Sequence, residues 1–415
     1  MSFVYKPPTE WIPPDSFPTE KLCQATEIAI DLETRDPSLK ELGPGYIRGD
    51  GEVVGISFAI DGYEDYFPFA HEQGFNFSKK KVIEFTKKIC ATDSDKIFHN
   101  ASYDVGWLTR EGVPINGRII DTMVVAPLID ENQYWYSLNA LGREYINEGK
   151  TEGELNAAAE EWGLDPKAEM WRLPSAYVGT YATQDAALTL KLWNHFKILL
   201  EEQNLWNVFD LEMRVLPVIL AMKQKGVRVD TDRAQSLKKQ LIKREKDIVQ
   251  QIKDESGVPE LQLWAANSLA KVFDAMNLTY LRTPTGMPSF TKAFLENHSH
   301  PIANLIREAR EVNKTHSTFI DSILKHAHNG RIHAEIRQLK GESGGTVTGR
   351  LSMSNPNLQQ VPARNKEIGP LIRSLFLPEE GELWCSADFS QQEPRILTHY
   401  ASRSKYDGAD AIADA

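Results

Sequence analysis

The segment Glu27-Ile28-Ala29-Ile30-Asp31-Leu32-Glu33 decides how the first half of the chain folds. Successive side chains of a strand point to opposite faces, so Ile30 and Leu32 can anchor one face in a core while Asp31 and Glu33 share the other. Two neighbouring carboxylates repel each other unless a cation joins them, and hard oxygen ligands suit Mg²⁺ or Mn²⁺. This spacing alone is weak evidence, because an acidic chain contains such pairs by chance as solvated surface groups.

The elements expected around this strand alternate between strands and helices. Three more strands are expected at residues 53–60, 66–69 and 96–98, and the short polar link between the first two favours antiparallel pairing. Helices are expected at residues 79–90, near Asp104 and at residues 176–203. This order predicts an α/β fold in which a mixed sheet is flanked by helices.

Two further motifs carry carboxylates. The first, His99-Asn100-Ala101-Ser102-Tyr103-Asp104, follows an expected strand and opens a helix, where the charge of Asp104 is tolerated. In the second, Tyr181-Ala182-Thr183-Gln184-Asp185, the first and last residues are four apart and share a helix face. An ordinary helix cap and a surface acid are the alternatives for these motifs when each is taken alone.

Together the three motifs resemble those of the proofreading exonucleases of the RNase H-like superfamily: Asp-x-Glu, Asn-x-x-x-Asp and Tyr-x-x-x-Asp, in this order. The resemblance spans about residues 25–205 and includes Arg118–Met123 as the strand after the second motif. It implies a 3′→5′ exonuclease that uses two divalent ions, Mg²⁺ or Mn²⁺, to hydrolyse the phosphodiester at a single-stranded 3′ end. The implied catalytic residues are Asp31, Glu33, Asp104, Tyr181 and Asp185, of which the four acids bind metal, Tyr181 orients the attacking water, and Asn100 contacts DNA.

The implied substrate has unpaired bases, which stack on aromatic side chains. Phe98, Tyr103 and Trp107 are candidates for this contact, although core packing is their expected role.

The second half of the chain opens with a helical, increasingly basic stretch at residues 209–254. Leu237, Leu241, Ile248 and Ile252 form an apolar stripe at helical spacing. The basic residues fit either a solvated helix face or an arm that follows a phosphate backbone. They are Lys238, Lys239, Lys243, Arg244 and Lys246. A second helical stretch is expected at residues 302–326, a loop at 279–290, and strands at 331–339 and 383–387.

Two segments in this half resemble family A DNA polymerases. Residues 348–362, Thr-Gly-Arg-Leu-Ser-Met-Ser-Asn-Pro-Asn-Leu-Gln-Gln-Val-Pro, are similar to the segment that lies against the primer–template minor groove, which implies that Arg350 and Gln359 contact DNA. Residues 388–395, Asp-Phe-Ser-Gln-Gln-Glu-Pro-Arg, are similar to the family's motif A. The resemblance makes Asp388 a metal ligand, Glu393 the gate against a 2′-hydroxyl, and Arg395 a nucleotide-binding residue.

Motifs B and C of that family are not found before Ala415. Two-metal phosphoryl transfer needs carboxylates from both motif A and motif C, so polymerisation is expected only if another chain supplies the fingers and the rest of the palm. The expected domains are a 3′→5′ exonuclease at residues 1–205, a helical thumb at 206–340, and the start of a palm at 341–415. The chain begins almost directly with the exonuclease, as in bacteriophage-type enzymes.

Composition sets limits on the rest. The 415 residues carry a net charge of −11, which by itself argues weakly against nucleic-acid binding, and three cysteines without metal-ligand spacing. No apolar run reaches the roughly 18 residues that cross a bilayer, and no signal peptide is evident, so a cytoplasmic location is expected (the host cytoplasm if the protein is viral). Two alternatives stay open: a primer–template DNA-binding module of a split polymerase, and a stand-alone RNA-trimming exonuclease.

Overall fold

The structure is a computed structural model that describes residues 9–342, 344–362, 365–403 and 408. The chain divides into two compact units, residues 1–376 and 377–415. Among the described residues, no helix combines the length and the apolar character that crossing a bilayer requires.

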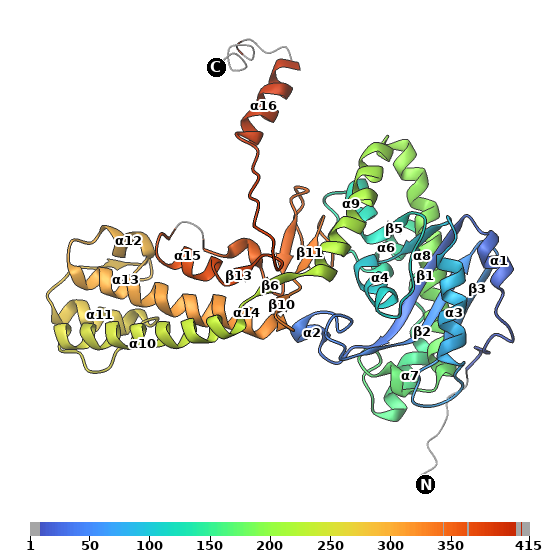
Figure 1. The fold of residues 1–415 in the computed structure, drawn as a ribbon, viewed down its shortest axis with the longest axis horizontal. Coiled ribbons are helices and arrows are strands. Elements are labelled where there is room, and N and C mark those ends of the chain that lie inside the picture. Colours follow the sequence, from blue (N-terminus) through green and yellow to red (C-terminus); the bar gives the residue numbers. More distant parts are fainter. Residues whose placement is uncertain (1–8, 343, 363–364, 404–407, 409–415) are drawn as a thin grey trace, which may run out of the picture. The chain divides into compact units, whose positions relative to one another are not determined.

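A five-stranded mixed sheet forms the centre of the first part of the chain (Figure 1). The strand order is β3-β2-β1-β4-β5; β2 pairs antiparallel with β1 and β3, whereas β4 pairs parallel with β1 and β5. The strands are β1 (Glu27–Arg35), β2 (Glu52–Ile60), β3 (Tyr63–Pro68), β4 (Asp95–Phe98) and β5 (Ile119–Asp121). The expected α/β class, mixed sheet and antiparallel start are therefore confirmed.

Alternation along β1 sends its side chains into two different cores. Ile30 and Leu32 lie in the core that includes residues of α3 (Lys79–Cys90) and α4 (Ala101–Arg110). Ala29 lies in the core on the other face, which includes residues of α8 (Ser175–Glu202). Because Asp31 and Glu33 follow Ala29 at intervals of two, they share its face and lie on the side of α8.

Shorter helices complete this part of the chain. They are α1 (Thr19–Gln24), α2 (Leu39–Leu42), α5 (Thr122–Ile129), α6 (Leu138–Ile146), α7 (Gly153–Trp162) and the 3-10 helix η1 (Met170–Arg172). The helix caps follow ordinary chemistry; for example, the Ser137 side chain accepts from the backbone N–H of Ala140 at the start of α6.

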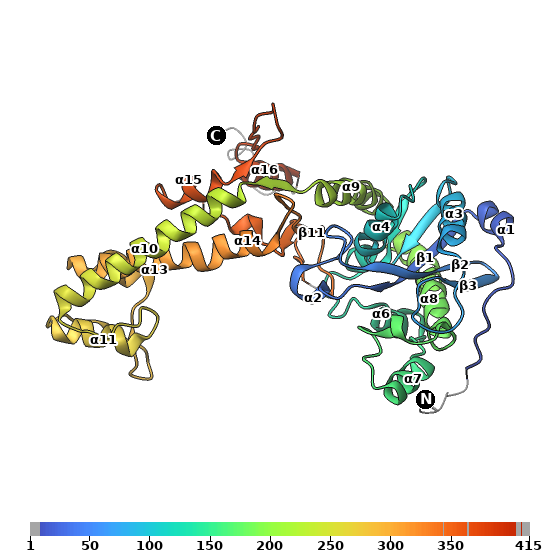
Figure 2. The ribbon, with the colours of Figure 1, turned by 60° about the horizontal axis from the view of Figure 1, so that its bottom comes forward.

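The helical stretch expected at residues 209–254 is two helices. Gly226 has φ +62°, a backbone conformation that residues with a side chain rarely adopt. It ends α9 (Trp206–Lys225) before the short strand β6 (Val227–Val229). The second helix, α10 (Thr231–Ser256), buries the predicted apolar stripe of leucine and isoleucine against α13 (Pro301–Lys314). The two helices run side by side in both views (Figure 1, Figure 2).

The remaining helices of the first unit continue this helical region. They are α11 (Ala266–Ala275), α12 (Lys292–Asn297), the π-helix η2 (Thr315–Ile320), α14 (Asp321–His326), the 3-10 helix η3 (Leu358–Gln360) and α15 (Ile368–Arg373). Together with α13, η2 and α14 make up the helical stretch expected at residues 302–326.

Small strands take the place of the longer one expected at residues 331–339. That segment is interrupted at His333 and Ala334 because its two halves have different partners: β10 pairs with β6 and β9, and β11 pairs with β12. The strands are β9 (Ala327–His328), β10 (Arg331–Ile332), β11 (Glu335–Arg337) and β12 (Ser352–Ser354). The loop expected at residues 279–290 contains a two-stranded pair, β7 (Leu281–Arg282) and β8 (Pro288–Ser289), and β13 (Phe376–Leu377) lies where the two units join in the chain.

The second unit contains α16 (Gln392–Arg403). The strand expected at residues 383–387 is wrong: these residues are exposed and irregular. A strand depends on a hydrogen-bonded neighbour, and within the described ranges these residues pair with none.

Candidate functional site

Asp31 and Glu33 present their carboxylates from the middle of β1. Asp31 pairs in register with Ser57 and Glu33 with Gly55, both on β2. The side chain of Glu33 is deeply buried, with a residue exposure of only 6%. Burying an unpaired carboxylate is costly, so this position needs a compensating positive charge.

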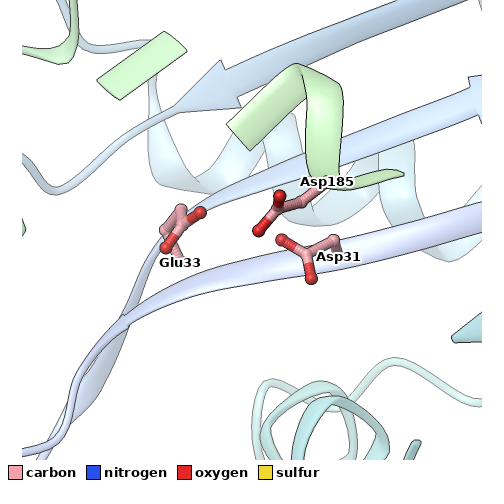
Figure 3. Close-up of side chains that lie close together, drawn as sticks. All are labelled: Asp31, Glu33 and Asp185. Atoms are coloured by element: carbon pink, nitrogen blue, oxygen red, sulfur yellow. The ribbon is translucent and has the colours of Figure 1, made fainter. Parts of the chain in front are cut away.

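Helix α8 brings Asp185 to the same place. One carboxylate oxygen from each of Asp31, Glu33 and Asp185 lies within 4.8 Å of the others, close enough to hold a metal ion (Figure 3). A second feature also indicates a metal site: the Oδ1 atom of Asp185 is buried and has no hydrogen-bond partner among the described residues. An acceptor left unpaired in a buried acidic cluster fits a divalent cation, and carboxylate oxygens are the ligands that Mg²⁺ and Mn²⁺ prefer.

Asp104 is tied to the same strand by another contact. Its Oδ1 accepts a 3.2 Å hydrogen bond from the backbone N–H of Leu32, the residue between Asp31 and Glu33. Asp104 is buried in the first turn of α4 but lies outside the group of three acids that meet within 4.8 Å. The four acids predicted from the sequence are therefore neighbours, with three of them in closer contact.

Asp121, at the end of β5, is a buried acid that supports the turn into α4 and that the sequence motifs did not single out. Its carboxylate accepts from the backbone N–H groups of Asn100 (2.9 Å), Ala101 (2.8 Å) and Met123 (2.9 Å). Asn100 has φ +72°, so this turn into α4 depends on Asp121 to hold it. An acid directly after a strand and before a helix was the available signal.

The electrostatics of the acids reflect their burial. The pKa of Asp31 is raised to about 7, first by burial and then by the charge of Asp185, against the opposing charge of Lys150. Burial first, and then the charge of Asp31, raises the pKa of both Glu33 and Asp104 above the usual range. Without cations these carboxylates are destabilised in their charged form, as expected for a site that takes up positive charge.

Lys150, between α6 and α7, supplies one positive charge and was also missed. Its Nζ atom lies 2.5 Å from Oδ2 of Asp185 and 3.2 Å from the hydroxyl oxygen of Tyr181. Tyr181 is buried on α8, one turn before Asp185, as its motif predicted. A single lysine in a polar connection has no spacing that distinguishes it, so no sequence signal pointed to Lys150.

The aromatic residues near the acids serve the core. Phe98 and Trp107 are fully buried in the protein interior. Tyr103 is partly buried, and its hydroxyl contacts the Thr34 hydroxyl at 2.6 Å and donates to Asp36 at 3.2 Å. Packing is thus the role that the contacts of Phe98 and Trp107 support.

A cavity of about 590 Å³ opens beside Glu33 within the first unit. Asn100 and Tyr103 are part of its lining, together with residues of α9 and β11. The lining also includes the lysines Lys40, Lys167 and Lys340. Cationic side chains around a cavity that reaches an acidic cluster suit an anionic chain whose backbone needs neutralising.

The predicted DNA contacts of the second half lie elsewhere. Arg350 is exposed in the loop before β12, and Gln359 is exposed on η3, where its Nε2 donates to the backbone carbonyl of Leu351 at 2.9 Å. The residues predicted from motif A are exposed in the second unit: Asp388, Glu393 and Arg395.

Part of the basic character of α10 is neutralised within the protein. Lys238 pairs with Asp321 at 2.5 Å, and Arg244 pairs with Glu308 at 2.6 Å and also with Glu367. Lys239, Lys243 and Lys246 are exposed. The helix therefore has a solvated basic face that is smaller than the sequence suggested.

Comparisons with known proteins agree with this geometry. The family model "3′-5′ exonuclease" matches residues 18–201, and the model "DNA polymerase family A" matches residues 231–406. A DNA-directed DNA polymerase of Pseudomonas phage M6 is 36% identical over 98% of this chain and 64% of its own length. DNA polymerase I of Pseudomonas aeruginosa is 28% identical over 92% of this chain and 41% of its own length.

A solved structure shares the fold. It is the POL domain of Pol1 from M. smegmatis in complex with DNA primer-template and dNTP, with a TM-score of 0.68, 21% identity, and coverage of 92% of this chain and 61% of that one. This chain thus spans less than two thirds of the length of these relatives. Its residues 18–201 are thus similar to the 3′-5′ exonuclease family, and its residues 231–406 are similar to DNA polymerase family A.

Proposed function

We propose that the chain is a metal-dependent 3′→5′ exonuclease that removes nucleotides from DNA 3′ ends, as the proofreading part of a family A DNA polymerase. The observation that carries the proposal is the meeting of Asp31, Glu33 and Asp185 within 4.8 Å, beside the unpartnered Oδ1 of Asp185. The lysines in the lining of the neighbouring cavity support an anionic substrate.

The residues of the site have separate roles in metal binding and in positioning the water. Asp31, Glu33 and Asp185 hold a divalent ion, Mg²⁺ or Mn²⁺, and Asp104 contributes to a second. When bound, a pair of such ions supplies an activated water and stabilises the charge on the leaving 3′-oxygen. Tyr181 orients the attacking water from its place one turn before Asp185, and no side-chain nucleophile is needed.

The rest of the chain extends this proposal. We assign residues 1–205 to the exonuclease, 206–340 to a thumb and 341–415 to the start of a palm, in a protein of the cytoplasm. Arg350 and Gln359 contact primer–template DNA, and Asn100 contacts the strand being shortened. The residues of motif A serve nucleotide and metal binding: Asp388, Glu393 and Arg395. A second chain that completes the polymerase stays a prediction from the sequence.

The test is an assay of primer shortening. The purified chain is incubated with a labelled primer–template that has a mismatched 3′ end, in Mg²⁺ or in EDTA. We expect stepwise shortening in Mg²⁺ only, reduced at least about 100-fold by Asp31→Asn, because metal-assisted charge stabilisation contributes several kcal/mol to the rate. Asp61→Asn makes the same chemical change in the exposed turn between β2 and β3 and should leave the rate unchanged.

Other results of the shortening assay would overturn the proposal or support one of the alternative functions. An inactive wild-type chain, or an Asp31→Asn variant as active as wild type, overturns the proposal. An idle exonuclease that still binds primer–template supports the DNA-binding module instead, and preferential shortening of RNA supports the RNA-trimming enzyme. Added nucleotides test extension: extension by this chain alone contradicts the expectation that a second chain is required.

A further inference from the structure

The strongest unexplained feature of the site is the ammonium group of Lys150 among the carboxylates. Its Nζ atom contacts Oδ2 of Asp185 at 2.5 Å and the Tyr181 hydroxyl at 3.2 Å, and it lies 5.0 Å from the centre of the Tyr181 ring. The side chain of Lys150 is only 16% exposed and that of Asp185 only 4%. Lysine and arginine side chains are rarely buried unless an acid pairs with them.

The backbone around Lys150 is fastened on both sides by one residue of α8. The Nε2 atom of Gln184 donates to the carbonyl of Gly149 at 3.0 Å, and its Oε1 accepts from the backbone N–H of Thr151. The N–H of Lys150 itself donates to Oδ1 of Asn139 at 2.9 Å. Because Gln184 directly precedes Asp185, the connection that carries the lysine is fixed to the same helix turn that carries the acid.

We propose that Lys150 is a positioning residue and built-in counter-ion of the exonuclease site, which holds Asp185 and Tyr181 in place and neutralises the acids before metal binds. The proposal rests on the exonuclease function proposed above. Lys150 contacts Oδ2 of Asp185, whereas Oδ1 of the same carboxylate has no hydrogen-bond partner in the part of the chain that the structure describes. One oxygen is thus fixed by the protein while the other stays available.

The positive charge of Lys150 also affects how the site binds the phosphodiester and the metal ions. Four carboxylates carry about four negative charges, which two divalent ions balance, and Lys150 leaves one positive charge for the phosphodiester. Before metal binds, the same ammonium partly offsets the repulsion among the acids. Once metal binds, the ammonium repels it, so the wild-type protein should bind divalent ions less tightly than a protein without this lysine.

Lys150→Met tests these expectations, because methionine keeps most of the length of the side chain and removes its charge. In EDTA the variant should unfold at a lower temperature than wild type, and Mn²⁺ should raise its melting temperature by more than it raises that of wild type. Calorimetry should show a smaller dissociation constant for Mn²⁺. With single-stranded DNA in saturating Mg²⁺, kcat should fall by about 10- to 100-fold with little change in KM, as is typical when a partner of a metal ligand is lost.

Two further variants separate positioning from general stability. Lys150→Arg keeps the charge and should restore a substantial part of kcat. Gln184→Ala loosens the connection and should lower kcat in the same direction by a smaller factor. The control is Lys191→Met, because Lys191 also joins α8 to the preceding connection, through Glu148 at 2.7 Å, but is exposed. It should stay within about twofold of wild type in every measurement.

The outcomes distinguish this proposal from the function on which it rests. A wild-type chain that shortens no DNA overturns the exonuclease function. Wild-type activity that Lys150→Met leaves intact, or weaker Mn²⁺ binding by that variant, overturns the role of Lys150 alone. A Lys150→Met chain that fails to fold even in Mn²⁺ shifts the decision to Lys150→Arg, which keeps the charge and must retain a substantial part of the wild-type kcat; an inactive Lys150→Arg chain that folds overturns the role of Lys150.

Discussion

The ammonium group of Lys223, on α9, lies 2.7 Å from the carboxylate of Glu335, on β11, and Lys223 is almost fully buried. Lys223 also donates to the hydroxyl of Ser102 at 3.0 Å, on the helix that carries Asp104. Lys223 therefore connects α4, through Ser102, with β11, the strand that follows the helical region. Since Arg337 at the end of β11 pairs in register with Ser352, the connection continues to β12, the strand that follows Arg350.

Lys223→Met should destabilise the protein by about 3 kcal/mol, because it leaves the carboxylate of Glu335 without its counter-ion in a largely buried place. The free energy of unfolding, measured with urea, checks this expectation. Lys79→Met is the matched control: Lys79 pairs with Glu111 at the same 2.7 Å but is 44% exposed, so its loss should cost less than about 1 kcal/mol. Equal losses of unfolding free energy in the two variants would contradict the expectation that the buried Lys223 pair contributes more than the exposed Lys79 pair.

Gly55→Ala should lower stability by about 1–3 kcal/mol, because added atoms in a filled core force their neighbours to move. A Cβ atom at Gly55 would lie 2.1 Å from the hydroxyl oxygen of Tyr66, which is itself fully buried. Gly55 also pairs in register with Glu33, so exonuclease activity should fall together with stability. Thermal unfolding and the shortening assay measure both effects.

Gly153→Ala is the control for this substitution. Gly153 is the first residue of α7, and a Cβ there would meet nothing within 4 Å. Alanine reduces the freedom of the unfolded chain, so this variant should be as stable as wild type or up to about 1 kcal/mol more stable. A Gly55→Ala protein that matches Gly153→Ala in stability would contradict the close contact with Tyr66.

His71 should make stability depend on pH. Its Nδ1 lies 2.9 Å from the carbonyl of Leu173 and must donate to it; in the neutral ring, Nε2 then accepts from the Tyr66 hydroxyl at 2.8 Å. Burial lowers the pKa of His71 from 6.5 to about 4, against the opposing effect of the carbonyls of Leu173 and Met170.

The sign of the effect follows from proton uptake. Between pH 6.5 and 4 the unfolded chain binds a proton that the folded protein does not, so stability falls as the pH falls through this range, by about 3 kcal/mol from His71. His71→Gln keeps a hydrogen-bonding group but cannot take up the proton. Urea unfolding at a series of pH values should therefore give a shallower acid slope for the variant, and identical slopes would refute the assignment.

The sequence predicted the sheet well because its signals are local. The strand at residues 27–33 shows strict alternation, and the helix at residues 79–90 has a clear apolar face, so both elements formed where expected. Gly226 was overlooked as a break between two helices, since a glycine inside a basic helical stretch is also tolerated without a turn. The strand expected at residues 383–387 depended on a neighbouring strand, which no local pattern can supply.

The site was predictable to the extent that its residues occur in motifs. Asp31, Glu33, Asp104, Tyr181 and Asp185 stand at spacings that a strand and two helices convert into shared faces. Lys150 reaches Asp185 from a connection between helices, and Asp121 supports the turn before Asp104 from the end of a strand. Their roles depend on tertiary contacts between segments distant in sequence, and no periodicity records such contacts.

The most direct test of the account is an anomalous diffraction measurement on crystals of the wild-type protein soaked in Mn²⁺. We expect an anomalous peak bounded by carboxylate oxygens of Asp31, Glu33 and Asp185, and its loss in crystals of Asp31→Asn. Crystals that show no peak between these three acids, or show their carboxyl groups turned away from one another, would contradict it.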